Sequence, residues 1–107
     1  MERKYKKFMK VMLLTPEDLE QTWVQRDGQL IDLRSPIAFR EGHIPGARNV
    51  PEEQLEQFLV RQNRQKFFIL YCQRGITSLY LGRKFAEKGY QIGALAGGMN
   101  AYEKWKL

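Results

Sequence analysis

Short apolar runs alternate along the chain with longer segments in which apolar residues recur at helical spacing. The apolar runs predict strands at residues 11–14, 30–33, 48–50, 67–71 and 92–95. Helices are predicted to start near residues 16, 36, 51 and 78, and after the glycine pair at 97 and 98. This alternation is typical of a mostly parallel sheet with helices on both faces.

Spacing within these segments predicts which side chains are buried. The run at 67–71 has no polar break, which is typical of a strand at the centre of a sheet that is covered on both faces. Thr15 and Pro16 mark the start of the first helix, as its N-cap and its first position. The side chains expected to face inward from the first, third and last helices are Leu19, Trp23 and Val24, then Leu55, Phe58 and Leu59, then Met99, Tyr102 and Trp105.

Length and cysteine content narrow the class of protein. A chain of 107 residues forms one domain, with a core that needs neither disulfides nor a structural metal. One cysteine and one histidine exclude an internal disulfide and a cysteine-rich zinc site, so no metal and no cofactor is expected. A lone cysteine fits a reducing compartment, and we expect a cytoplasmic protein.

Positive charge is concentrated at the N-terminus. The formal net charge is +6, and the five cations within residues 1–10 face only Glu2. We expect residues 1–10 to form a basic arm that precedes a single domain at 11–107. The arm is interpreted as a solvated tail or as a segment that attracts anionic substrates. No nucleic-acid motif follows it, and no apolar run reaches the roughly 20 residues of a membrane-spanning helix.

The residues with the clearest chemistry follow the predicted central strand. Cys72 comes directly after the apolar run, Arg74 stands two places later, and Gly75 lets the loop turn toward the helix predicted from Ser78. Backbone N–H groups in such a loop and the positive end of a helix dipole both favour a thiolate. Cys72 is therefore a candidate nucleophile, with a small buried side chain as the alternative. Arg74 is interpreted as a clamp for an anionic group or as an exposed cation.

Other polar residues near predicted strand ends are assigned smaller roles. Thr77 and Ser78 offer hydroxyl groups, and Ser78 is also a candidate helix cap. Asp32 and Arg34 lie at the end of the second predicted strand, where a structural ion pair is expected. His43 is interpreted as organising a turn, with a cysteine–histidine catalytic pair as the alternative.

Four segments follow one another in an order that is similar to a known family. They are Ile31-Asp32-Leu33-Arg34, the stretch from Phe39 to Pro51 with Gly42-His43-Ile44-Pro45-Gly46-Ala47 inside it, the loop Cys72-Gln73-Arg74-Gly75-Ile76-Thr77, and Leu95-Ala96-Gly97-Gly98 before the last helix. Together they resemble the rhodanese-like (sulfurtransferase) domain family from about Leu14 to Lys106. The second segment is the most specific, because it closely matches the family's Gly-His-Ile-Pro-Gly-Ala element.

The resemblance implies a three-layer α/β/α fold with a central, mostly parallel sheet of about five strands. It implies a sulfurtransferase in which Cys72 attacks the outer sulfur of thiosulfate, releases sulfite and becomes a persulfide. Cyanide, a small thiol or a protein thiol then collects the sulfur, and no cofactor takes part. The residues that the resemblance places around the substrate are Gln73, Arg74, Gly75, Ile76, Thr77 and Ser78, with Asp32, Arg34 and His43 as structural neighbours.

The resemblance also leaves alternatives. Phosphatases of similar fold carry an arginine where this chain has Ser78, which disfavours that activity. A non-catalytic binding module is disfavoured by the presence of Cys72. A persulfide carrier would take sulfur from a cysteine desulfurase, and without a second cysteine the sulfur must pass to an outside acceptor. The chain is expected to act as a monomer, with neither nucleic acid nor a membrane as partner.

Overall fold

The computed structural model describes residues 11–107, so the predicted basic arm at residues 1–10 lies outside the described residues. Within the described part, five strands form one sheet: β1 (Met12–Leu14), β2 (Gln29–Asp32), β3 (Arg48–Asn49), β4 (Phe67–Tyr71) and β5 (Gln91–Leu95). They pair in the order β1-β5-β4-β2-β3, and every pairing is parallel. The predicted parallel sheet is confirmed, with β4 at its centre.

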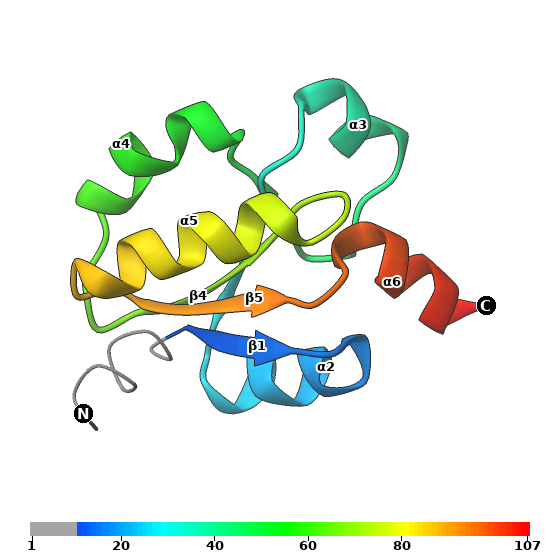
Figure 1. Ribbon diagram of the computed structural model, residues 1–107, viewed down its shortest axis with the longest axis horizontal. Coiled ribbons are helices and arrows are strands. Elements are labelled where there is room, and N and C mark those ends of the chain that lie inside the picture. The colour runs from blue at the N-terminus through cyan, green and yellow to red at the C-terminus, as the bar shows by residue number, and fades with distance from the viewer. Residues whose placement is uncertain (1–10) are drawn as a thin grey trace.

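Helices cover both faces of this sheet. They are α2 (Pro16–Gln25), α3 (Pro36–Glu41), the short 3-10 helix η1 (Glu52–Gln54) that leads into α4 (Leu55–Val60), α5 (Ile76–Glu87) and α6 (Gly98–Lys106). Buried residues of α4 and α5 pack on one face, and buried residues of α2 and α6 pack on the other. Figure 1 shows α4 and α5 above the sheet and α2 below it, with α6 at the right. The three-layer α/β/α arrangement is thus confirmed.

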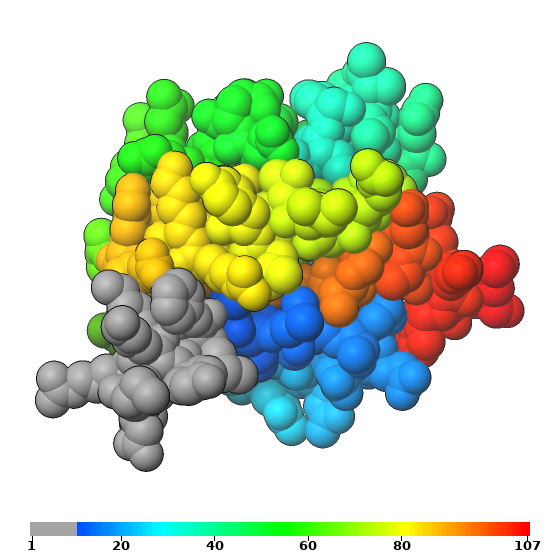
Figure 2. All heavy atoms as spheres, viewed as in Figure 1, coloured from blue at the N-terminus to red at the C-terminus, as the bar shows by residue number. Residues whose placement is uncertain are grey.

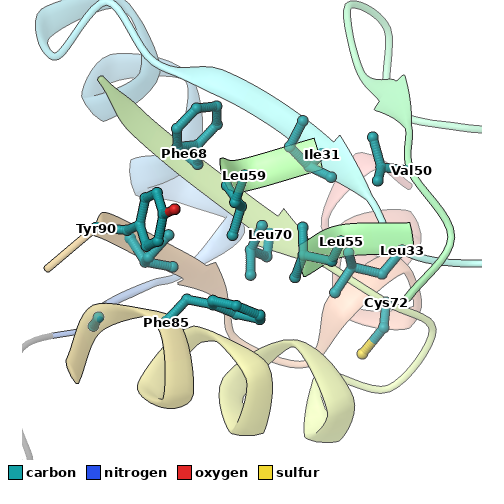
Figure 3. Close-up of a cluster of buried hydrophobic side chains, with 12 residues drawn as sticks. Ile31, Leu33, Val50, Leu55, Leu59, Phe68, Leu70, Cys72, Phe85 and Tyr90 are labelled. Atoms are coloured by element: carbon teal, nitrogen blue, oxygen red, sulfur yellow. The ribbon is translucent and has the colours of Figure 1, made fainter. Parts of the chain in front are cut away.

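Strand β4 supplies the core of both layers, because successive side chains of a strand point to opposite faces. Its five residues are all buried. Phe68 and Leu70 join the cluster on the α4–α5 side, and Cys72 continues that series one residue beyond the strand. Figure 3 shows Cys72 at one end of this cluster, with its sulfur atom turned toward the first turn of α5. Phe67, Ile69 and Tyr71 belong to the opposite cluster.

Helix α2 starts where the sequence predicts, but one of the side chains that were expected to be buried is exposed. The Thr15 hydroxyl accepts a hydrogen bond from the Asp18 backbone N–H at 3.3 Å, and Pro16 opens the helix. Leu19 is buried and Trp23 packs against the same cluster one turn later. Val24 was expected inside and is 75% exposed, because it lies about 100° around the helix from Trp23 and so falls outside the buried stripe.

The end of α6 also departs from the expected pattern. Met99 is buried and Tyr102 packs against its cluster, as predicted. Trp105 was expected to face inward and is 43% exposed, because it lies in the last turn of α6, which projects past the sheet (Figure 1). No helix within residues 11–107 is long and apolar enough to cross a membrane.

Candidate active site

The candidate site lies where the parallel strands end at their carboxyl termini, the edge at which ligands bind in sheets of this type. Cys72 follows β4 at that edge, and Arg34 follows β2 two residues after its buried end at Asp32. The glycine pair Gly97 and Gly98 follows β5, whose last residue pairs with the end of β1. Three loops that are distant in sequence therefore converge around one thiol.

The sulfur atom of Cys72 is held by backbone hydrogen bonds. The N–H of Gly75 donates to Sγ at 3.2 Å, and the N–H of Ser78 donates to it at 3.3 Å. The thiol in turn donates to the Ser78 hydroxyl oxygen at 3.4 Å. Cys72 is only 8% exposed. Because two N–H donors point at the sulfur from the start of a helix, the site favours an anionic sulfur atom there.

Gly75 explains why these N–H groups reach the sulfur. Its φ of +89° is left-handed, and a Cβ at this position would lie 2.7 Å from the backbone nitrogen of Gly97. The chain therefore enters α5 at once, and the helix begins at Ile76 rather than near Ser78. The prediction that Ser78 caps the helix is wrong, because Ser78 lies inside the first turn, fully buried. N–H groups in a first turn have no partner within the helix, so that of Ser78 is free for Sγ.

The first turn of α6 fixes the other side of the cysteine loop. The N–H of Met99 donates to the carbonyl oxygen of Cys72 at 2.8 Å, and the N–H of Asn100 donates to that of Gln73 at 3.0 Å. The amide of Gln73 also donates to the side-chain oxygen of Asn100. Both loop carbonyls are thereby directed to α6 and away from the sulfur. The sequence interpretation missed Met99 and Asn100 as site residues, and the glycine pair before them was the only signal.

Asp32 and Arg34 form the ion pair that the sequence predicts. Arg34 Nη2 lies 2.8 Å from Asp32 Oδ2, and Asp32 is completely buried. The hydrogen bond to Asp32 raises the pKa of Arg34 above its usual value. The same guanidinium donates to the Gln73 side-chain oxygen at 3.1 Å and to the Gly42 carbonyl at 2.6 Å. The pair is structural, and it connects the end of β2 to the cysteine loop.

Tyr71, the residue before the thiol, points to the opposite side of the sheet. Its hydroxyl accepts a hydrogen bond from the Ile44 backbone N–H at 3.1 Å. Burial, and then the interaction with the Asp32 carboxylate, raises the pKa of Tyr71 well above its usual value. The sequence interpretation counted Tyr71 as core alone. The structure adds that its hydroxyl ties the turn at Ile44 to the central strand.

His43 makes its contacts with Phe39 rather than with the thiol. Its Nδ1 lies 2.8 Å from the Phe39 carbonyl oxygen, and the two rings stack with their centroids 3.7 Å apart. His43 itself is exposed. These contacts support the interpretation that His43 organises a turn.

The remaining residues expected around the substrate differ in exposure. Arg74 and Gln73 are exposed, Thr77 is half-buried, and Ile76 is 69% exposed. Among residues 11–107, Arg74 has no side-chain hydrogen bond and no ion pair, so its guanidinium is available to a ligand. No group of three His, Cys, Asp or Glu side chains in the described part of the chain is arranged to hold a metal ion.

This geometry suits a nucleophilic thiol better than a phosphate cradle. Two N–H groups converge on Cys72 Sγ, and no guanidinium of the described residues donates to it. Ser78 occupies the position where phosphatases of similar fold carry an arginine, and its side chain is buried against the sulfur. The arrangement can hold one negative charge on sulfur at the mouth of a short loop.

Comparison with known proteins relates this chain to one family. A model of the rhodanese-like domain matches residues 15–104. The uncharacterized protein YqhL of Bacillus subtilis is 38% identical over 93 residues, which cover 86% of this chain and 70% of YqhL. The thiosulfate sulfurtransferase GlpE of Shewanella oneidensis is 28% identical over 92 residues, covering 85% of this chain and 91% of GlpE.

A solved structure gives the same relationship. The reduced CoADR-RHD of Bacillus anthracis superposes with a TM-score of 0.76 at 29% sequence identity, over 87% of this chain. This chain spans only 16% of that longer protein, so the likeness concerns one part of it.

Proposed function

Because the chain belongs to the rhodanese-like domain family, we propose that it is a sulfurtransferase that carries a sulfur atom as a persulfide on Cys72. The observation that carries this proposal is the pair of N–H donors, from Gly75 and Ser78, at 3.2 and 3.3 Å from Sγ. These donors stabilise the thiolate that attacks and the persulfide that results, since both place negative charge on sulfur near the same loop.

The proposed reaction has two displacement steps. In the first, the Cys72 thiolate attacks the outer sulfur of thiosulfate, the sulfur–sulfur bond of thiosulfate breaks, and sulfite leaves with the electron pair. In the second, cyanide or a thiolate attacks the outer sulfur of the persulfide, and Cys72 leaves as a thiolate. Arg74, exposed beside the loop, is proposed to hold the sulfonate end of thiosulfate.

The proposed compartment and the need for an outside sulfur acceptor both follow from the single cysteine. Cys72 is the single cysteine of the chain, so it remains active only where thiols stay reduced, as in the cytoplasm. The sulfur must leave to an outside acceptor, because no second cysteine can displace it as a disulfide. We propose that the chain acts as a monomer, and that a cysteine desulfurase is the alternative donor if thiosulfate loads it slowly.

Intact-protein mass spectrometry tests the persulfide directly. The reduced protein is incubated briefly with thiosulfate, its mass is recorded, and cyanide is then added. A gain of one sulfur atom that cyanide removes is the expected result, and the single cysteine assigns it to Cys72. No gain in mass, with a thiol that an alkylating reagent still modifies, would contradict transfer from thiosulfate and favour a protein donor or a binding module.

A further inference from the structure

The outer side of α5 presents two large apolar side chains next to the cysteine loop. Ile76, the first residue of α5, is 69% exposed, and Tyr80, one turn later, is 67% exposed. Residues four apart on a helix are neighbours, so the two side chains form one ridge. Figure 2 shows α5, in yellow, open on the face turned toward the viewer. Adjoining apolar side chains that stay in contact with water are a feature of contact surfaces.

Positive charge lies beside this ridge. Arg74, Arg83 and Lys84 line a hollow of about 670 Å³ together with Ile76 and Tyr80. Within residues 11–107 the one ion pair joins Asp32 and Arg34, so the cations of the hollow have no carboxylate partner there. Glu87 is the acidic residue at the far end of the hollow. Glu52 and Glu53 line a second hollow that shares Ile76 and Tyr80, so the ridge has carboxylates on that side and cations on the other. The hollow with Arg74, Arg83 and Lys84 holds three cations and one carboxylate, and it is therefore the side that is complementary to a segment with several negative charges.

The surface extends too far to serve thiosulfate or cyanide. Lys84 lies eight positions after Ile76, which is about 12 Å along a helix. An extended peptide covers that length with about four residues. Ile76 is the first residue of α5, and the first turn of α5 donates an N–H group to Sγ. A peptide of a partner protein that lies along α5 would therefore reach the sulfur with one end and the cations with the other.

We propose that Arg74, Ile76, Tyr80, Arg83 and Lys84, here called the α5 surface, bind an acidic segment of a protein that presents the sulfur-accepting thiol. The inference rests on the proposed function and names its acceptor class. The acceptor thiolate attacks the outer sulfur of the Cys72 persulfide, the bond from that sulfur to Sγ breaks, and Cys72 leaves as a thiolate. The acceptor becomes a persulfide, and no oxidant or reductant is consumed.

Two thiol peptides of opposite charge provide the test. One has the sequence Cys-Gly-Phe-Asp-Glu-Asp and the other Cys-Gly-Phe-Lys-Arg-Lys, and each serves as acceptor with thiosulfate as donor. The quantity measured is the ratio of kcat/KM for the acidic peptide to kcat/KM for the basic peptide. Using this ratio within each variant cancels the different intrinsic reactivity of the two peptide thiols.

The principal variant reverses charge in the hollow, and a matched variant reverses it elsewhere. Arg83→Glu with Lys84→Glu is compared with Arg61→Glu and Lys66→Glu, which are exposed residues near the amino end of β4, at the edge of the sheet opposite Cys72. The principal variant is expected to lower the ratio about tenfold or more, while cyanide turnover at saturating thiosulfate stays within about twofold. The matched variant has the same net charge and is expected to leave the ratio unchanged.

Binding without chemistry separates this inference from the proposed function. Versions of the peptides with serine in place of cysteine are labelled, and their binding is followed by fluorescence anisotropy. The acidic version is expected to bind the wild-type protein more tightly than it binds the principal variant or Tyr80→Ser, whether or not a persulfide forms.

Three results would overturn the inference. An equal fall of the ratio in both charge variants would show an effect of net charge alone. Equal binding of the acidic serine peptide to the wild type and to the principal variant would show that the α5 surface does not dock it. Tighter binding of a single-stranded oligonucleotide of equal charge would assign the surface to nucleic acid instead.

Discussion

The N–H of Met99 donates to the carbonyl oxygen of Cys72 at 2.8 Å, so the first turn of α6 holds the residue that carries the thiol. This bond and its neighbour from Asn100 direct the loop carbonyls away from Sγ. Carbonyl oxygens near a thiolate would repel its charge, whereas the N–H groups of Gly75 and Ser78 attract it. The backbone environment of the Cys72 sulfur thus depends on α6, although α5 and β5 lie between Cys72 and α6 in the sequence.

Gly98→Ala is expected to damage the site through this contact. The φ of Gly98 is +59°, and an added Cβ would fall within 2.8 Å of the Gln73 carbonyl oxygen and against that of Cys72. The strain should lower the free energy of unfolding by about 1–3 kcal/mol and slow persulfide formation about tenfold. Urea unfolding and the rate of sulfite release measure the two effects.

Gly42→Ala is the matched control, since a Cβ there meets no atom within 4 Å and the backbone is extended. Its free energy of unfolding should stay within about 0.5 kcal/mol of the wild type. If Gly98→Ala behaves like Gly42→Ala, the contact between α6 and the cysteine loop does not constrain the site.

Cys72→Ser should abolish sulfur transfer and leave the fold intact. Serine has nearly the same shape, and Cys72 lies at the edge of its cluster rather than at its centre (Figure 3). The hydroxyl is too weak a nucleophile to replace the thiolate. Thiocyanate formation and thermal unfolding check the two halves of this prediction, and transfer that survives the substitution would remove Cys72 from the mechanism.

Arg74→Ala should raise KM for thiosulfate about tenfold while kcat and stability change little. Arg74 is exposed and makes no side-chain hydrogen bond within residues 11–107, so its loss removes an anion contact rather than packing. Steady-state kinetics with cyanide as acceptor provide the measurement. Arg61→Ala, an exposed arginine at the other end of the sheet, is the control. An unchanged KM would mean that Arg74 faces solvent throughout the reaction.

Arg34→Ala should lower the free energy of unfolding by about 3 kcal/mol, because it leaves the buried Asp32 carboxylate without its counter-ion. Adding Asp32→Asn removes that charge and should restore part of the loss. The two substitutions are therefore expected to be non-additive in a double-mutant cycle. Additive losses would show that the two side chains act independently, despite the 2.8 Å between them.

Alkaline pH should destabilise the protein through Tyr71. Because its pKa is raised in the folded state, the stability that it contributes is complete below pH 10 and is lost as pH rises further. Above pH 10 the unfolded chain ionises this phenol and the folded chain does not, which costs up to about 1.4 kcal/mol per pH unit.

Tyr71→Phe should remove this alkaline slope. Its stability at neutral pH should be about 1 kcal/mol lower, since the Ile44 N–H loses its acceptor. Urea unfolding of both proteins between pH 8 and pH 11.5 measures the difference. Parallel curves for the two proteins would contradict a raised pKa at Tyr71.

The fold follows from the sequence where local signals and burial agree. Thr15 and Pro16 set the start of α2, and the unbroken apolar run at 67–71 identifies the central strand. Val24 was misplaced because an apolar residue next to the buried stripe of a helix can still lie outside it, and Trp105 because apolarity does not say where a helix leaves the sheet. These are errors of side-chain orientation, and they leave the order of helices and strands untouched.

The site was predicted less completely, for a physical reason. Cys72 and Gly75 have side-chain or conformational signals in the sequence, and both lie in the loop as expected. Met99 and Asn100 act through backbone N–H groups, which every residue except proline has, so no residue type indicates them. Ser78 was given the wrong role because the left-handed Gly75 starts α5 two residues early.

The alternation of side chains along β4 limits how this chain can change in length within that strand. Phe68, Leu70 and Cys72 share one face because they are separated by even steps. Deleting one residue from 67–71 would turn the thiol to the α2–α6 side, away from the N–H groups of α5. In descendants of this chain, substitutions within β4 can therefore keep the thiol beside the N–H groups of α5. Insertions or deletions within β4 can do so only when they add or remove an even number of residues.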